Sequence, residues 1–216
     1  GPGYLAEAAL ETGAILVHIS TDYVFAGDKT EPYSEDDPTG PLSSYGRSKL
    51  KGEKAILASG LTRYFIIRTS WLYGPGGKNF VETILRLATE REELRIVSDQ
   101  HGSPTYTEDL ANAIFSLLET EDARRPYGIY NFSNAGSCSW YEFAVEIVRL
   151  ARSNKLQVKV ERIIPIRTED FPLPAKRPSY SVFSKQKYET ITGRTIPDWR
   201  EGLIKYFAVR QNGQPR

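Results

Sequence analysis

Two continuous apolar runs flank one helical segment near the start of the chain, and this pattern constrains the fold most strongly. The first run is Ala14–Ile19 and the second is Tyr64–Thr69. Runs of this length are typical of strands covered on both faces of a parallel sheet. Between them, Ser43 or Ser44 starts a helical pattern that ends near Ser59. We therefore predict an α/β fold with adjacent parallel strands and a right-handed crossover.

The rest of the chain continues this alternation of helices and short strands. A helix over Tyr4–Thr12 is expected to end at Gly13 in a left-handed cap. Ser139 and Glu142 have the spacing of a capping box at the start of another helix. Further helices are predicted near 80–89, 107–119 and 184–192, with further strands near 94–97 and 129–132.

Composition narrows the class of protein. The 216 residues include 28 basic and 27 acidic side chains, and they form no basic stripe, so nucleic-acid binding is not expected. No apolar run suits a membrane span, and one cysteine, Cys138, rules out an internal disulfide. With only two histidines, which lie far apart in the sequence, a Cys/His metal site is not expected. A cytoplasmic protein is the default expectation, and the absence of methionine suggests that the sequence starts after the true N-terminus.

Tyr45 and Lys49 are the residues most suggestive of chemistry. Four residues on a helix place two side chains on one face. A lysine ammonium within about 4–6 Å favours the phenolate and lowers a tyrosine pKa from its usual value of roughly 10. Such a pair can deliver a proton to a carbonyl oxygen. This spacing occurs once among the 13 tyrosines.

A hydroxyl-bearing segment, Ser20-Thr21-Asp22, lies at the end of the first predicted strand. Open α/β sheets bind ligands at the carboxyl ends of their strands. An isolated threonine there commonly bonds to the backbone. A threonine followed by Tyr45 and Lys49 on the next helix favours a catalytic site.

Together these residues resemble the extended short-chain dehydrogenase/reductases, and most closely the dTDP-4-dehydrorhamnose reductase family. Three segments carry the resemblance at the strand ends and the catalytic helix: His18–Phe25, Pro41–Glu53 and Arg68–Gly74. Later segments are similar to further motifs of the family: Asn79-Phe80, Asp99–Thr105 and Arg177-Pro178. The resemblance covers nearly the whole chain.

The resemblance implies a Rossmann-type parallel sheet lacking its first strands, with a smaller C-terminal sugar-binding lobe. Residues 1–75 would be the remnant of the Rossmann domain. Residues 76–216 would mainly bind substrate, with 107–132 returning to the sheet. The implied reaction is reduction of dTDP-4-dehydro-L-rhamnose, a nucleotide-linked 4-keto-6-deoxy sugar, by NADPH or NADH. Mg²⁺ and a homodimer are implied by the family alone.

The resemblance also assigns roles to individual residues. The catalytic group would be Thr21, Tyr45 and Lys49, with Thr21 orienting the sugar carbonyl and Tyr45 donating the proton. The cofactor would contact Ser20, Tyr45, Lys49, Thr69 and Ser70. The substrate would contact Asp22, Tyr23, Trp71, Asn79, Gln100 and Arg177, whose guanidinium suits a phosphate.

No G-x-G-x-x-G follows any predicted strand in these 216 residues. Gly74–Lys78 is too short for a phosphate loop, so we expect this chain to bind a dinucleotide weakly. Two alternatives stay open. One is a sugar-nucleotide epimerase or 4,6-dehydratase. Dehydratases, however, are expected to have the segment Thr-Asp-Glu at this strand end, and this chain has Tyr23 in place of the glutamate. The other is a non-catalytic regulatory subunit of the same fold, such as the one that accompanies methionine adenosyltransferase.

Overall fold

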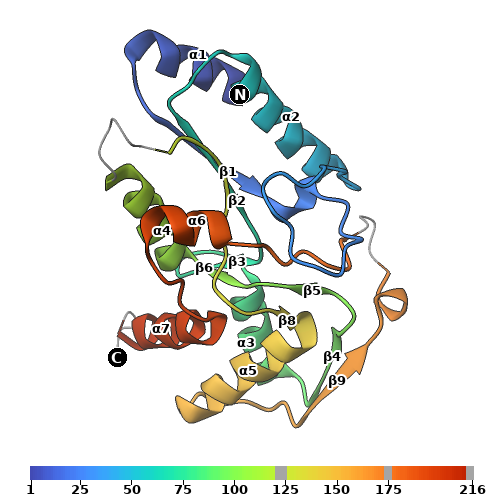
Figure 1. The fold of residues 1–216 in the computed structure, drawn as a ribbon. Helices are drawn as coiled ribbons and strands as arrows, with labels where there is room; N and C mark the ends of the chain where they lie inside the picture. The colour runs from blue at the N-terminus through green and yellow to red at the C-terminus, as the bar shows by residue number, and fades with distance from the viewer. Residues whose placement is uncertain (120–125, 173–176, 213–216) are drawn as a thin grey trace. The chain divides into compact units, whose positions relative to one another are not determined.

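The structure, a computed structural model, describes residues 1–119, 126–172 and 177–212 (Figure 1). Contacts divide the chain into two compact units, each assembled from separate stretches of sequence. Unit 1 comprises residues 1–70, 112–133 and 175–195, and unit 2 comprises residues 71–111, 134–174 and 196–216. No helix in the described ranges is long and apolar enough to cross a membrane.

Unit 1 contains the predicted parallel sheet. Strand β1 (Leu16–Thr21) pairs with β2 (Tyr64–Thr69), and β2 pairs with β7 (Gly128–Asn131), all in parallel. The predicted order of strand, helix and strand is confirmed. The first strand begins and ends two residues later than predicted, so Ser20 and Thr21 belong to the strand.

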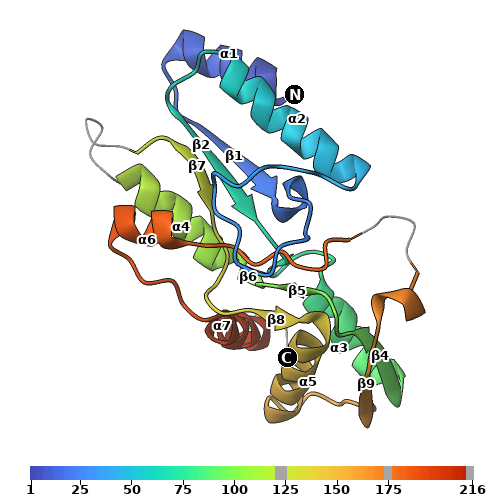
Figure 2. The ribbon, with the colours of Figure 1, turned by 45° about the vertical axis from the view of Figure 1, so that its right-hand side comes forward.

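Two helices cover one side of this sheet, as Figures 1 and 2 show. Helix α1 (Pro2–Thr12) ends at Gly13, whose φ of 68° is the predicted left-handed cap. Helix α2 (Ser44–Ala58) is the crossover helix, and its first turn is capped by the Ser43 hydroxyl. Helix α6 (Gln186–Thr192) lies on the opposite side of the strands, where Lys187 donates to the Ile129 carbonyl (Figure 2).

The described part of unit 2 has three two-stranded sheets, with helices around an apolar core. The pairs are β3 (Leu72–Tyr73) with β6 (Thr105–Tyr106), β4 (Glu93–Val97) with β9 (Arg162–Ile166), and β5 (His101–Gly102) with β8 (Cys138–Ser139). The helices are α3 (Phe80–Glu90), α5 (Trp140–Ser153) and α7 (Trp199–Asn212). Helix α4 (Thr107–Glu119) starts in unit 2 and ends in unit 1.

The capping box predicted for α5 is confirmed, because Ser139 and Glu142 satisfy each other's backbone N–H groups. Phe143 and Ile147 of this helix are buried in the core of unit 2, as their helical spacing indicates. Helix α7 was not predicted. Its buried residues, including Trp199 and Leu203, alternate with charged residues and a glycine, so the apolar stripe is hard to see in the sequence.

Candidate active site

Helix α2 starts very close to the backbone that follows β1. Gly46 makes this approach possible, because a β-carbon at this position would lie 2.2 Å from the Tyr23 carbonyl oxygen. Ser43 caps the same turn, and its hydroxyl accepts a hydrogen bond from the Gly46 N–H at 3.0 Å. The residue between Ser44 and Gly46 is Tyr45, so the cap and the glycine together fix where this tyrosine leaves the helix.

The Tyr45 side chain is 57% exposed and therefore open to a ligand. Its ring packs edge-on against Tyr23, with centroids 5.8 Å apart and planes at 79°. Tyr23 lies in η1 (Asp22–Val24), a short 3₁₀ turn that directly continues β1. Burial raises the pKa of Tyr23, the nearby Asp22 carboxylate raises it further, and Arg177 opposes the shift. Tyr45 thus has one ring contact within the protein, and more than half of the residue stays accessible.

Lys49 lies one turn after Tyr45 on α2 and reaches the backbone of β1. Its ammonium donates a hydrogen bond to the Ile19 carbonyl at 2.5 Å. Burial lowers the pKa of Lys49, while the negative charge of Glu53 opposes the shift. Lys49 is therefore bonded to β1 two residues before Thr21, the last residue of that strand.

Thr21 and Asp22 form a compact polar end to β1. The Thr21 hydroxyl donates to Asp22 Oδ1 at 2.9 Å and accepts from the Tyr23 N–H at 3.3 Å. Asp22 is only 3% exposed, and its Oδ2 has no hydrogen-bond partner among the described residues. Burial raises the pKa of this carboxyl to about 6, against the opposing hydrogen bonds of Thr21 and Ser181.

Ser20 is buried on the face of β1 that meets α2. Its hydroxyl donates a short hydrogen bond to Glu53, and Glu53 also forms an ion pair with Arg68 of β2 at 2.8 Å. Neither charged residue was singled out from the sequence, although a signal was there. Arg68 interrupts an otherwise apolar strand, Tyr-Phe-Ile-Ile-Arg-Thr, and a buried arginine requires an anionic partner.

The structure places nine of the predicted site residues in unit 1: Ser20, Thr21, Asp22, Tyr23, Tyr45, Lys49, Thr69, Ser70 and Arg177. Thr69 pairs with Thr21 across the two strand ends, and Ser70 follows it. Both are buried, at 6% and 2% exposure. Arg177 is exposed. Trp71, Asn79 and Gln100 belong to unit 2.

Trp71 has an unusual conformation for a bulky residue, with a φ of 47°. Its ring stacks on Trp140 with centroids 3.5 Å apart, and Gly102 leaves room for it, because a β-carbon there would lie 2.5 Å from the indole. The Phe80 ring lies against Trp140, with ring centroids 4.5 Å apart. The half-buried Trp71 is thus held by a cluster of aromatic rings, and strained backbone of this kind is typical of functional sites.

The two polar residues predicted in unit 2 already have structural partners. Asn79 caps α3 by accepting from the Glu82 N–H at 3.0 Å, and its amide donates to the Gly74 carbonyl at 2.9 Å. The amide of Gln100, which is 5% exposed, donates to the Thr168 hydroxyl at 3.0 Å. Both side chains therefore shape loops of unit 2, and their contact with substrate stays a prediction.

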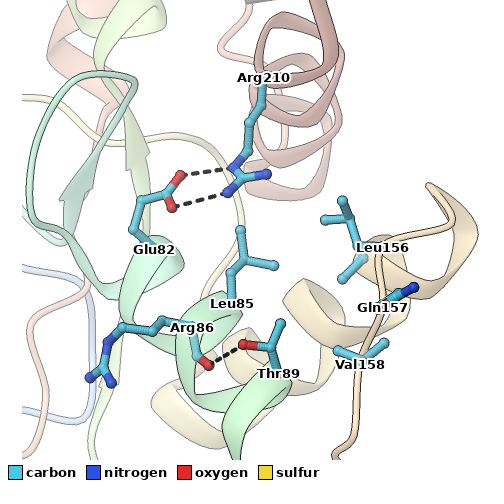
Figure 3. A pocket seen from close by; sticks show the side chains of 9 residues that line it. Glu82, Leu85, Arg86, Thr89, Leu156, Gln157, Val158 and Arg210 are labelled. Carbon is cyan, nitrogen blue, oxygen red and sulfur yellow. Dashed lines mark hydrogen bonds and ion pairs between the residues drawn. The ribbon is translucent and has the colours of Figure 1, made fainter. Parts of the chain in front are cut away.

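Unit 2 also has an open cavity of about 350 Å³ between α3, α5 and α7 (Figure 3). Arg210 and Glu82 form an ion pair at its rim with an Nε–Oε1 distance of 3.0 Å. The cavity is lined by none of the predicted site residues. Within the described ranges, no group of three or more His, Cys, Asp or Glu side chains could hold a metal ion.

A parallel sheet with Thr21 at one strand end and Tyr45 and Lys49 on the crossover helix has the arrangement of an extended short-chain dehydrogenase/reductase. Comparison with known proteins narrows this class. Residues 1–211 match the family model of the RmlD substrate binding domain. The chain belongs to the dTDP-4-dehydrorhamnose reductase family.

Individual relatives agree with this assignment. The chain is 47% identical to the spore coat polysaccharide biosynthesis protein SpsK of Bacillus subtilis, an alignment that covers 98% of the chain and 70% of the relative. It is 39% identical to the dTDP-4-dehydrorhamnose reductase of Escherichia coli, over 92% of the chain and 67% of that protein. The chain thus spans about two thirds or slightly more of the length of these relatives.

Solved structures of the family have the same fold. The dTDP-4-dehydrorhamnose reductase of Bacillus anthracis, in complex with NADP, superimposes with a TM-score of 0.88 at 44% identity. The alignment covers 96% of this chain and 70% of that one. An orthologue from Clostridium acetobutylicum gives a TM-score of 0.89 at 43% identity, over 97% of this chain and 71% of that one.

Proposed function

We propose that the protein reduces the 4-keto group of a nucleotide-linked 6-deoxy sugar, converting dTDP-4-dehydro-L-rhamnose to dTDP-L-rhamnose with NADPH or NADH. The observation that carries this proposal is the arrangement of Thr21, Tyr45 and Lys49 in a chain 39% identical to the Escherichia coli reductase. The NADP complex of the relative from Bacillus anthracis supports a nicotinamide cofactor.

The residues present suit such a cofactor. Tyr45 is exposed and Lys49 is half-buried, so a ligand at the end of β1 could reach both side chains. A bound nicotinamide cofactor would supply hydride chemistry at the carbonyl carbon. Lys49 would bind the ribose hydroxyls. Ser20, Thr69 and Ser70, which are buried, remain predicted cofactor contacts.

Tyr45 is the proposed proton donor. Its O–H bond breaks as the sugar C4 oxygen gains the proton, so the product is an alcohol and the side chain becomes a phenolate. The positive charge of Lys49 stabilises that phenolate, and the Thr21 hydroxyl donates to the same carbonyl oxygen and orients it. Solvent then returns the proton to Tyr45.

The residues proposed to contact the substrate are Asp22, Tyr23, Trp71, Asn79, Gln100 and Arg177. Tyr23 favours reduction over elimination. Removing water across C5 and C6 needs one group to take the C5 proton and another to protonate the departing hydroxyl. A tyrosine supplies apolar surface and one hydroxyl, which suits binding a deoxysugar better. A homodimer, implied by the family resemblance, completes the proposal.

A substrate comparison tests this function in the full-length protein. With dTDP-4-dehydro-L-rhamnose, NADPH should be oxidised in equal amount to the alcohol formed. With dTDP-glucose, no 4-keto-6-deoxy product should appear. Formation of that product would show a dehydratase, and an absence of turnover with either sugar would favour a regulatory subunit.

A further inference from the structure

Glu53 and Arg68 form a buried ion pair that the proposed reaction does not use. Their side chains are 1% and 4% exposed, and the guanidinium donates to the carboxylate through Nη2 at 2.8 Å and Nε at 3.2 Å. A buried pair of this kind adds little net stability, because the loss of hydration offsets the attraction between the charges. Stability alone is therefore a weak reason for its presence next to Lys49.

The pair connects α2 to both strands beneath it. Ser20 and Arg68 are neighbours in the pairing of β1 and β2, and both side chains donate to the Glu53 carboxylate. Arg68 also donates through Nη1 to the Glu35 carbonyl at 3.1 Å, and its guanidinium lies 5.0 Å from the Phe25 ring centre. The carboxylate thus joins the helix to two strands, and Arg68 extends this network to the loop after β1.

The same carboxylate lies on the helix face that carries the proposed chemistry. Tyr45, Lys49 and Glu53 are spaced four residues apart on α2, so they follow one another along one face. Lys49 bonds to the carbonyl of Ile19, and Glu53 bonds to the hydroxyl of the next residue, Ser20. Two adjacent residues of β1 are therefore fixed by two adjacent turns of α2. These contacts fix α2 against β1 at Lys49 and Glu53, and Tyr45 lies one turn before Lys49 on the same helix.

We infer that Glu53 is a positioning residue for Tyr45 and Lys49. It holds this pair in place against the end of β1, and its negative charge compensates the positive charge of Lys49. This inference rests on the proposed function. Glu53 acts through Lys49 and Ser20 and contacts no reacting atom.

The charges around Lys49 agree with this role. Burial lowers the pKa of Lys49, and Glu53 counteracts that effect. His18 of β1 adjoins both residues, and burial and the Lys49 charge lower its pKa. The other titratable or charged groups on elements packed against α2 are Tyr4, Glu7 and Glu11 of α1, Asp22 and Tyr23 of η1, and Tyr64 and Arg68 of β2, of which Arg68 is the partner of Glu53.

The test compares Glu53→Gln with the charge-balanced variant Glu53→Gln/Arg68→Gln in the full-length protein. Competitive labelling with acetic anhydride across pH, read by mass spectrometry, gives the pKa of Lys49 without any turnover. In Glu53→Gln we expect this pKa to fall by about half to one unit, because the anion is gone and the Arg68 charge remains. In the double variant the fall should be smaller, because both charges are removed.

Activity gives a second measurement. In Glu53→Gln the alkaline limb of the kcat profile should move to lower pH by the same amount as the Lys49 pKa. Glu82→Gln is the matched control, because it makes the same substitution in the Glu82–Arg210 ion pair of unit 2. It should change neither the Lys49 pKa nor the limb.

An unchanged Lys49 pKa in both Glu53 variants would overturn the inference and leave the ion pair a purely structural link. If Glu53→Gln does not fold, the Lys49 pKa of the double variant decides alone: a fall supports the inference, and an unchanged value overturns it. Absence of sugar reduction in the unmodified protein would refute the proposed function, while the labelling result would still decide the role of Glu53.

Discussion

The two units of this protein are stabilised in different ways. In unit 1, buried polar and charged residues gather where α2 meets the strand ends, with Asp22, Glu53 and Arg68 each no more than 3% exposed. In unit 2, the core is a large apolar cluster in which Phe143, Trp199 and Tyr206 are almost completely buried. Burying the charged groups of unit 1 removes their hydration and opposes folding, whereas burying the apolar side chains of unit 2 favours folding.

The difference indicates that the buried groups of unit 1 serve chemistry and that the core of unit 2 serves stability. Buried ionisable groups are retained in proteins mainly where their charge or hydrogen bonding has a use, because their desolvation opposes folding. An aromatic core contributes stability through the area it removes from water. Removing the buried charge of Asp22 in unit 1 and removing an aromatic ring from the core of unit 2 should therefore have opposite effects on the free energy of unfolding.

The largest expected effect on stability is in unit 2. Trp199 is fully buried at the start of α7, edge-on to Phe143 with centroids 5.6 Å apart. Trp199→Ala should lower the free energy of unfolding by about 3–5 kcal/mol, because it leaves a cavity in the core. Denaturant unfolding measures this, with the exposed Glu201→Ala on the same helix as the control. A loss below about 1 kcal/mol would mean that the core does not depend on this ring.

The smaller effect, with the opposite sign, is in unit 1. Asp22→Asn should raise the free energy of unfolding by about 1–3 kcal/mol at pH 8, because it removes a buried charge and keeps an oxygen for the Thr21 hydroxyl. The carboxyl has a folded pKa of about 6, above its usual 3.8. As the pH falls, the native state therefore binds a proton before the unfolded state does. The free-energy cost of burying the charged carboxylate is largest above pH 6.

The pH dependence provides the check on Asp22. As pH falls from 6 towards 4, the native carboxyl becomes protonated, so the difference between Asp22→Asn and the unmodified protein should shrink. Denaturant unfolding at pH 8 and pH 5 measures this, with the exposed Asp36→Asn as the control. A difference that is the same at both pH values would show that the charge of Asp22 is not the cause.

The sequence predicted unit 1 better than unit 2, for a physical reason. The βαβ unit depends on local patterns, an apolar run and a capped helix, and both are confirmed in β1, α2 and β2. The Glu53–Arg68 pair joins residues 15 positions apart in sequence, and the Trp71–Trp140 stack joins residues from distant segments. Such contacts depend on tertiary packing, which periodicity does not reveal. The predicted roles of Thr21, Tyr45 and Lys49 stay predictions.

The most direct test of the central claim is the turnover of Tyr45→Phe in the full-length protein, with Tyr127→Phe as the control. Tyr45→Phe keeps the ring that packs against Tyr23 and removes only the proposed proton donor. Turnover of the 4-keto sugar should fall by roughly 10²–10⁴-fold while the fold, checked by circular dichroism, is unchanged. Tyr127→Phe removes a hydroxyl elsewhere in unit 1 and should retain turnover. Near-normal turnover in Tyr45→Phe would contradict the account, because another group would then supply the proton.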